Sequence, residues 1–221
     1  MKKIMISAVA ALSLVSCVNT SSNNANGEFE DSLDIIEVAT DEAIVSSVPD
    51  DAELLAEDEL TGMKAYVVNL SVMHDGDGET LSEFWLEDKD GNAKKMFTTN
   101  EEWQDMDWET PKKYPITQIM AVDKADFIYN KAEKKTYIVL SGCPDARNEF
   151  VYLMPASFDS KEALFLCCAD GYFGFDDDSQ HILGGSYGYH EEGGRYGILK
   201  EMDFNGKVLE KNIIEDENYM Q

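Results

Sequence analysis

The sequence predicts an all-β domain, an antiparallel meander that forms a sandwich or an open barrel with at most one or two short helices. From about residue 62 onward, the chain repeats short apolar runs that are rich in aromatic and β-branched residues. Clusters of turn-forming residues flank these runs. The connections are too short to hold helices, so consecutive strands are expected to pair antiparallel.

The expected strands follow one another at 65–73, 84–86, 95–98, 116–122, 127–129, 136–140, 150–154 and 164–168. Turns at Asp88–Asn92 and Asn130–Glu133 separate two pairs of them. Near the C-terminus, Asn205-Gly206 lies between two further apolar stretches. Asn-Gly is the strongest short hairpin signal, because both residues tolerate the positive φ of a type I′ turn. About ten strands are expected in all.

Two of these runs, 150–154 and 164–168, are apolar at every position instead of alternating. This pattern is typical of central strands covered on both faces. The phrase 196–211 also resembles the outer hairpin of a propeller blade. A propeller ranks below the sandwich, because the sequence shows no repeat and the domain barely holds four blades.

Two short helices are expected. Pro49-Asp50-Asp51, followed by Ala, Leu and Glu, begins one that Gly62 ends, with Pro at an early position and acids near the positive end of the helix dipole. The second lies at Asn100–Trp108, with Glu101 and Glu102 in its first turn.

Charge and aromatic content divide the chain. It carries 44 acidic and 18 basic residues, a net charge of −26. This excess argues against nucleic acid as a partner, since a phosphate backbone is held by clustered Lys and Arg.

The ten Phe, ten Tyr and three Trp all follow Gly62 except Phe29, so the globular domain is expected at 62–221.

The first residues predict an export leader. Lys2 and Lys3 precede an apolar stretch, Ile4–Leu14, that is too short to span a membrane. Leu14-Val15-Ser16-Cys17 follows, and at these residues the chain resembles bacterial lipoproteins, whose lipobox ends in a small residue and a cysteine.

The resemblance covers only the leader. It implies that residues 1–16 are a signal peptide removed by signal peptidase II. Cys17 would then receive diacylglycerol and an acyl chain such as palmitate, and would anchor the protein in the membrane of the cell envelope. In the lipoprotein pattern, Val at position 18, where Asp would favour the inner membrane, implies the outer membrane. The alternative is an ordinary secretory leader with a coincidental cysteine.

Residues 17–61 are expected to form a tether. Val18–Gly27 is almost entirely Asn, Ser, Thr and Ala. Glu28–Leu60 holds thirteen acidic residues and no Lys or Arg. An extended spacer explains this composition. Its apolar residues, among them Ile44, Val45 and Val48, leave open docking on the domain as an edge strand, or partner binding.

Three cysteines remain after Cys17. Cys143 is able to bridge to Cys167 or Cys168 in an oxidising compartment, but adjacent strand residues point to opposite faces, so at most one of the two is well aimed. The alternative is that they are small buried apolar residues.

No metal or cofactor is expected. His74–Glu79 places carboxylates at alternate positions, as calcium loops do. It does not match an EF-hand, because, counted from Asp75, the sixth position is Thr80 instead of Gly and the twelfth is Leu86 instead of Glu. Asp176-Asp177-Asp178 with His181 is the second candidate. Solvent-exposed turns explain both segments better than metal sites do.

The stretch Gly184–Gly197 predicts a hairpin with His190–Gly194 as its loop. Tyrosines beside glycines leave aromatic faces accessible for stacking on a sugar or a peptide, and three polar residues add contacts. The candidate binding residues are therefore Tyr187, Tyr189, Tyr196, Glu191, Glu192 and Arg195. Cross-strand aromatic packing is the alternative.

No catalytic residues are assigned. Ser141-Gly142-Cys143-Pro144 does not match the nucleophile elbow of hydrolases. A pair of carboxylates for glycan hydrolysis is not identifiable from spacing in so acidic a chain. The sequence favours a non-catalytic envelope lipoprotein whose domain binds an unknown ligand or protein partner. The alternatives are a secreted hydrolase acting on glycan or peptide and a purely structural lipoprotein.

Overall fold

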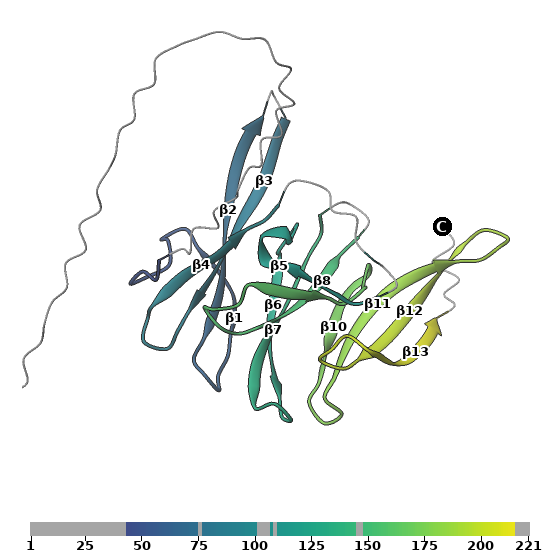
Figure 1. Cartoon of the computed structure of the whole chain (residues 1–221). Coiled ribbons are helices and arrows are strands. Elements are labelled where there is room, and N and C mark those ends of the chain that lie inside the picture. Colours follow the sequence, from purple (N-terminus) through teal and green to yellow (C-terminus); the bar gives the residue numbers. More distant parts are fainter. Residues whose placement is uncertain (1–42, 75–76, 101–106, 108–109, 145–147, 215–221) are drawn as a thin grey trace, which may run out of the picture. The chain divides into compact units, whose positions relative to one another are not determined.

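The structure is a computed structural model that describes residues 43–74, 77–100, 107, 110–144 and 148–214 (Figure 1). The expected signal peptide, Cys17 and the first part of the expected tether lie outside these ranges. So does most of the helix expected at 100–108, and so do two of the residues in the acidic segment 74–79. Within the described residues, no helix is long and apolar enough to cross a membrane.

The described residues form thirteen strands in three sheets, each built from one continuous part of the chain. The first sheet has the order β1-β2-β3-β4, from β1 (Glu53–Glu57), β2 (Lys64–His74), β3 (Asp77–Glu87) and β4 (Ala93–Thr98). The second has the order β5-β9-β8-β7-β6, from β5 (Lys112–Pro115), β6 (Lys124–Asn130), β7 (Lys135–Gly142), β8 (Phe150–Pro155) and β9 (Glu162–Phe165). The third has the order β10-β11-β12-β13, from β10 (Gly171–Asp176), β11 (His181–Tyr189), β12 (Arg195–Met202) and β13 (Val208–Ile214).

The predicted all-β class is confirmed. Every pairing between these strands is antiparallel, and the described strands close no barrel. The one helical element within the described ranges is a 3₁₀ turn, η1 (Ile116–Gln118). The arrangement is that of a sandwich with three sheets, as the cores show.

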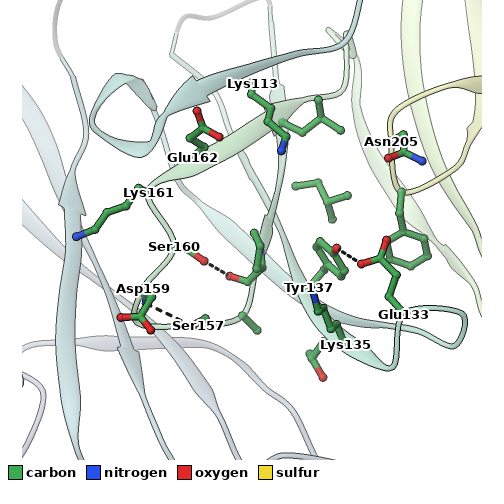
Figure 2. A pocket seen from close by; sticks show the side chains of 16 residues that line it. Lys113, Glu133, Lys135, Tyr137, Ser157, Asp159, Ser160, Lys161, Glu162 and Asn205 are labelled. Atoms are coloured by element: carbon green, nitrogen blue, oxygen red, sulfur yellow. Dashed lines mark hydrogen bonds between the residues drawn. The ribbon is translucent and has the colours of Figure 1, made fainter.

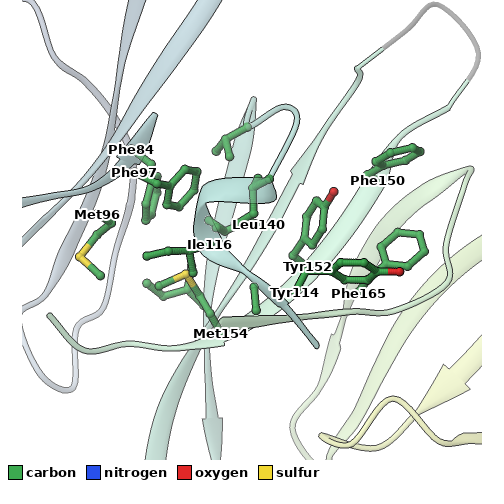
Figure 3. Packing of buried hydrophobic residues seen from close by; sticks show 14 of the residues in the cluster. Phe84, Met96, Phe97, Tyr114, Ile116, Leu140, Phe150, Tyr152, Met154 and Phe165 are labelled. Atoms are coloured by element: carbon green, nitrogen blue, oxygen red, sulfur yellow. The ribbon is translucent and has the colours of Figure 1, made fainter. Parts of the chain in front are cut away.

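One core joins the first and second sheets. Phe84 and Phe97 stack with ring centroids 5.3 Å apart on the first sheet. They belong to one buried cluster with Leu140, Tyr152 and other residues of the second sheet (Figure 3). Each fully buried aliphatic or aromatic side chain of this kind contributes about 1.5–3 kcal/mol, so this cluster is a main source of stability.

A second core lies on the opposite face of the middle sheet. Along β7, Ile138 and Leu140 belong to the first core, whereas Val139 between them belongs to the second. In the second core, Val139 joins Ile182 and Met202 of the third sheet. The middle sheet is therefore covered on both faces, which confirms the prediction made from the unbroken apolar run at 150–154.

The strand expected at 116–122 is wrong. The segment begins with η1, and three of its apolar residues, Ile116, Ile119 and Val122, enter the first core. Their spacing of three brings them to one side of an irregular connection instead of to one face of a strand. The edge strand β5 precedes this segment and pairs with β9.

The folded region begins before Gly62. The helix expected after Pro49 is wrong, because Glu53–Glu57 forms β1 and pairs with β2. Val45 also makes an isolated bridge to Ala93. The residues from 45 to 61 that the sequence assigned to the tether thus include part of the first sheet, and the alternative of an N-terminal segment docked as an edge strand describes them better.

Candidate binding site on the third sheet

The candidate site lies on the face of the third sheet that points away from the middle sheet. Ile182 and Met202 oppose each other across β11 and β12 and are buried in the second core. Because side chains alternate along a strand, the neighbouring residues point the other way. The opposed pair Gly185 and Leu199 and the opposed pair Tyr189 and Arg195 therefore share the outer face.

Tyr187 and Tyr189 stand side by side on this outer face. Their ring centroids lie 5.6 Å apart in an edge-to-face arrangement. Tyr189 is 70% exposed, whereas Tyr187 is half-buried. Neither residue belongs to a core cluster, and Tyr189 is the more accessible ring of the two.

Arg195 holds Tyr187 in place. Its guanidinium carbon lies 3.7 Å from the centre of the Tyr187 ring, a cation–π contact worth about 0.5–1 kcal/mol at a partly exposed position. The same guanidinium donates a hydrogen bond to the Asp170 carboxylate. The Tyr187 hydroxyl donates to Asn148 Oδ1 at 3.1 Å. These contacts fix the ring and leave Tyr189 beside it open to solvent.

Phe173 extends the aromatic surface and was missed from the sequence. Its ring lies over Gly185, where an added Cβ would come within 2.6 Å of two ring atoms. The ring is nevertheless 58% exposed. The register of β10 shifts between Tyr172 and Gly174, and this irregularity breaks the alternation by which sequence reasoning assigns faces. The glycines of β11 were the available signal, since they make room for rings from neighbouring strands.

Tyr196 does not join this surface. It opposes Gly188 on the other face of the hairpin, and an added Cβ on Gly188 would come within 2.4 Å of the Tyr196 ring. Its centroid lies 4.8 Å from that of His190. The hairpin itself is confirmed, with the loop at 190–194, but the three tyrosines are divided between its two faces. Glu191 and Glu192 are exposed in the loop.

The polar groups near the aromatic rings are paired with one another. Burial raises the pKa of Asp170, and the guanidinium of Arg195 opposes this shift. Burial is also the largest cause of the raised pKa of Tyr187. His181 Nδ1 lies 2.8 Å from Glu201 Oε2 at the far end of the same strands. The outer face therefore offers hydrogen-bonding groups with little net charge next to exposed rings. We define it as the aromatic face, made of Phe173, Tyr187, Tyr189, Arg195 and Asp170.

The first sheet provides a useful contrast. Tyr66 and Trp85 oppose each other on its outer face. Two ion pairs cross this face, Lys64–Glu87 at 3.0 Å and Lys95–Glu83 at 3.2 Å. The Trp85 indole N–H donates to Glu83 at 3.1 Å. Charged side chains thus surround these two half-buried rings, whereas Tyr189 and Phe173 are largely open.

A groove with a volume of about 860 Å³ lies outside the aromatic face. It opens between one end of the middle sheet and the turn that joins β12 to β13 (Figure 2). Its floor is apolar and includes Tyr137, Leu153, Leu164 and Phe204. The sequence did not predict it, because its wall and floor come from distant parts of the chain.

The two buried cysteines offer little reactivity. Cys167 and Cys168 are buried free thiols, so neither bridges to Cys143, which is exposed. As adjacent residues they enter different cores, Cys167 the first and Cys168 the second. Burial raises the pKa of Cys167 to about 11 and that of Cys168 to about 12, which suppresses the reactive thiolate. The interpretation as small buried residues is confirmed for these two.

The acidic turn at 176–178 is explained by its own hydrogen bonds. The Asp176 carboxylate accepts from the Ser179 hydroxyl at 2.8 Å and from the Asp178 backbone at 3.0 Å. Asp177 pairs with Lys131 at 2.8 Å. Among the described residues, no group of three or more His, Cys, Asp or Glu side chains is arranged to hold a metal ion.

Comparison with known proteins identifies no family for this chain. No protein-family model, no curated protein and no solved structure matches the chain.

Proposed function

We propose that the protein is a lipid-anchored lipoprotein of the cell envelope, in the outer membrane, whose β domain binds a neutral glycan on the aromatic face without catalysing a reaction. The observation that carries this proposal is the exposure of Phe173 and Tyr189, at 58% and 70%, beside the partly buried ion pair of Arg195 and Asp170.

The chemistry of the face favours sugars. An exposed ring stacks on the apolar C–H face of a sugar, and nearby charged groups hydrogen-bond its hydroxyls. The chain's net charge of −26 disfavours polyanionic ligands. A neutral glycan avoids this repulsion and uses both kinds of contact.

The binding test uses the full chain, purified in a detergent without a sugar headgroup and screened on an array of neutral oligosaccharides. The best glycan is then titrated calorimetrically against wild type, Tyr189→Ala and Phe173→Ala. Each substitution is expected to weaken binding on the order of tenfold, because an interfacial aromatic anchor contributes about 1–2 kcal/mol. Circular dichroism checks the fold.

Leu54→Ala is the control, because Leu54 is also a large exposed apolar residue, at 49%, but lies on the first sheet. It is expected to bind like wild type. If Tyr189→Ala and Phe173→Ala bind every such glycan as tightly as wild type does, the aromatic face is not the glycan-binding site. Absence of glycan binding would favour a structural role.

The anchor has its own test. Cys17→Ser is expected to abolish incorporation of radiolabelled palmitate, because the thiol that carries the diacylglycerol is lost. Cys143→Ser, the exposed cysteine of the domain, is the control and is expected to incorporate palmitate like wild type. Labelling that persists in Cys17→Ser would refute anchoring at this residue.

A further inference from the structure

We infer that the groove beside the β12–β13 turn is a second binding site, for a small organic anion with an apolar or aromatic body. It is separate from the aromatic face, and its argument does not depend on glycan binding.

The wall of the groove is rigid. The turn at Asn205-Gly206 is held by the Asp203 carboxylate, which accepts from the backbone of Asn205 and of Lys207, both at 2.9 Å. Gly206 is buried, and an added Cβ there would lie 2.7 Å from Pro111 and 3.4 Å from Leu164. The turn therefore packs tightly against the middle sheet, and the groove exists before any ligand arrives. Preformed pockets of roughly 300–1,000 Å³ are typical of small-molecule sites, and this groove has about 860 Å³.

The floor suits an apolar body. Tyr137 and Phe204 contact each other with centroids 5.3 Å apart, and Leu153 and Leu164 continue the surface between them and β5. A planar or branched apolar group that rests on this floor would remove the exposed part of the floor from water. Each Å² of apolar surface buried in this way contributes about 25 cal/mol to binding.

Lysine side chains supply the positive charge that an anion requires. Lys113, Lys135 and Lys161 line the groove together with Glu133, Asp159 and Glu162, so its lining is balanced in a chain with 44 acidic and 18 basic residues. Lys113 and Lys135 form no ion pair within the described part of the chain, and Figure 2 shows the Lys113 amine directed into the groove.

The acidic residues oppose an anion only weakly. Glu133 is exposed, so solvent screens its charge, and its carboxylate accepts a hydrogen bond from the Tyr137 hydroxyl at 2.7 Å. Figure 2 shows the Glu162 carboxylate turned away from the centre of the groove. Asp159 is exposed at the rim, where solvent screens its charge.

The experiment compares two probes of the same shape, phenylacetate and neutral phenylacetamide, by ligand-observed NMR titration of the full chain in a non-ionic detergent at low salt. Detergent alone gives the background. Wild type is expected to bind phenylacetate about tenfold more tightly than phenylacetamide, because a hydrogen bond to a charged group contributes more than one to a neutral group.

The double variant Lys113→Gln with Lys135→Gln is expected to bind both probes equally. Both lysines are exposed, so the fold is expected to persist, and circular dichroism checks it. Lys89→Gln, at an exposed turn of the first sheet, is the matched control and should behave like wild type. Tyr189→Ala should also keep phenylacetate binding, which separates this site from the aromatic face. Equal binding of the two probes by wild type, an unchanged preference in the double variant, or no saturable binding would each overturn the inference.

Discussion

At the scale of single residues, exposure decides which side chains are available for binding. The tyrosine and glycine pattern of residues 184–197 predicted accessible rings, and Tyr189 is exposed at 70%. Tyr196 was grouped with it, but Tyr196 lies on the next strand, where the register pairs it with Gly188 and so places it on the opposite face. Phe173 was not predicted, because its position depends on a register shift in β10, and the alternation of side chains along a strand does not reveal such a shift.

Thiol reactivity tests the assigned burial of the cysteines. With Cys17 lipidated or replaced by serine, the native chain at pH 8 is expected to react rapidly with a chromogenic aromatic disulfide at Cys143 alone. Cys167 and Cys168 are buried, which shields both thiols from the reagent. Burial also raises their pKa values to about 11 and about 12, so both remain protonated at pH 8. Denaturant should expose all three. Rapid reaction of more than one thiol in the native chain would contradict the buried placement.

At the scale of elements, local patterns located most strands and failed where long-range packing decides. Unbroken apolar runs identified β8, and Asn-Gly identified the turn before β13. The segment 53–57 contains only Glu, Leu and Ala, which favour helix, yet pairing with β2 makes it a strand. Intrinsic propensity amounts to less than about 1 kcal/mol per residue, so tertiary contacts override it.

Two glycines with the same backbone conformation separate strain from packing at the turns. Gly91 and Gly206 both have positive φ, 83° and 73°, but only an added Cβ at Gly206 meets other atoms. We expect Gly91→Ala to lower the free energy of unfolding by about 1 kcal/mol, through backbone strain alone. Gly206→Ala adds a clash with Pro111 and should lose about 2–3 kcal/mol. Urea denaturation measures both, and equal losses would refute the tight packing of this turn.

At the scale of the whole molecule, the sequence predicted the class but not the arrangement. The aromatic content placed the core after residue 62, and the all-β class is confirmed. The division into three successive sheets, and the two cores on either side of the middle sheet, depend on contacts between residues far apart in the chain. For the same reason, the groove between the middle sheet and the β12–β13 turn had no sequence signal. The charge pattern implied a long tether, yet part of that segment joins the first sheet.

The central claim is that the protein binds its ligand on the outer face of the third sheet. Hydroxyl-radical footprinting of the full chain, with and without the tightest-binding neutral glycan, tests it most directly, because exposed aromatic rings are readily oxidised. Phe173 and Tyr189 are expected to be protected by the glycan, while Tyr66 and Trp85 on the first sheet keep their reactivity. Protection of Tyr66 and Trp85, or of the groove residues Tyr137 and Phe204, with Phe173 and Tyr189 unchanged, would contradict the claim.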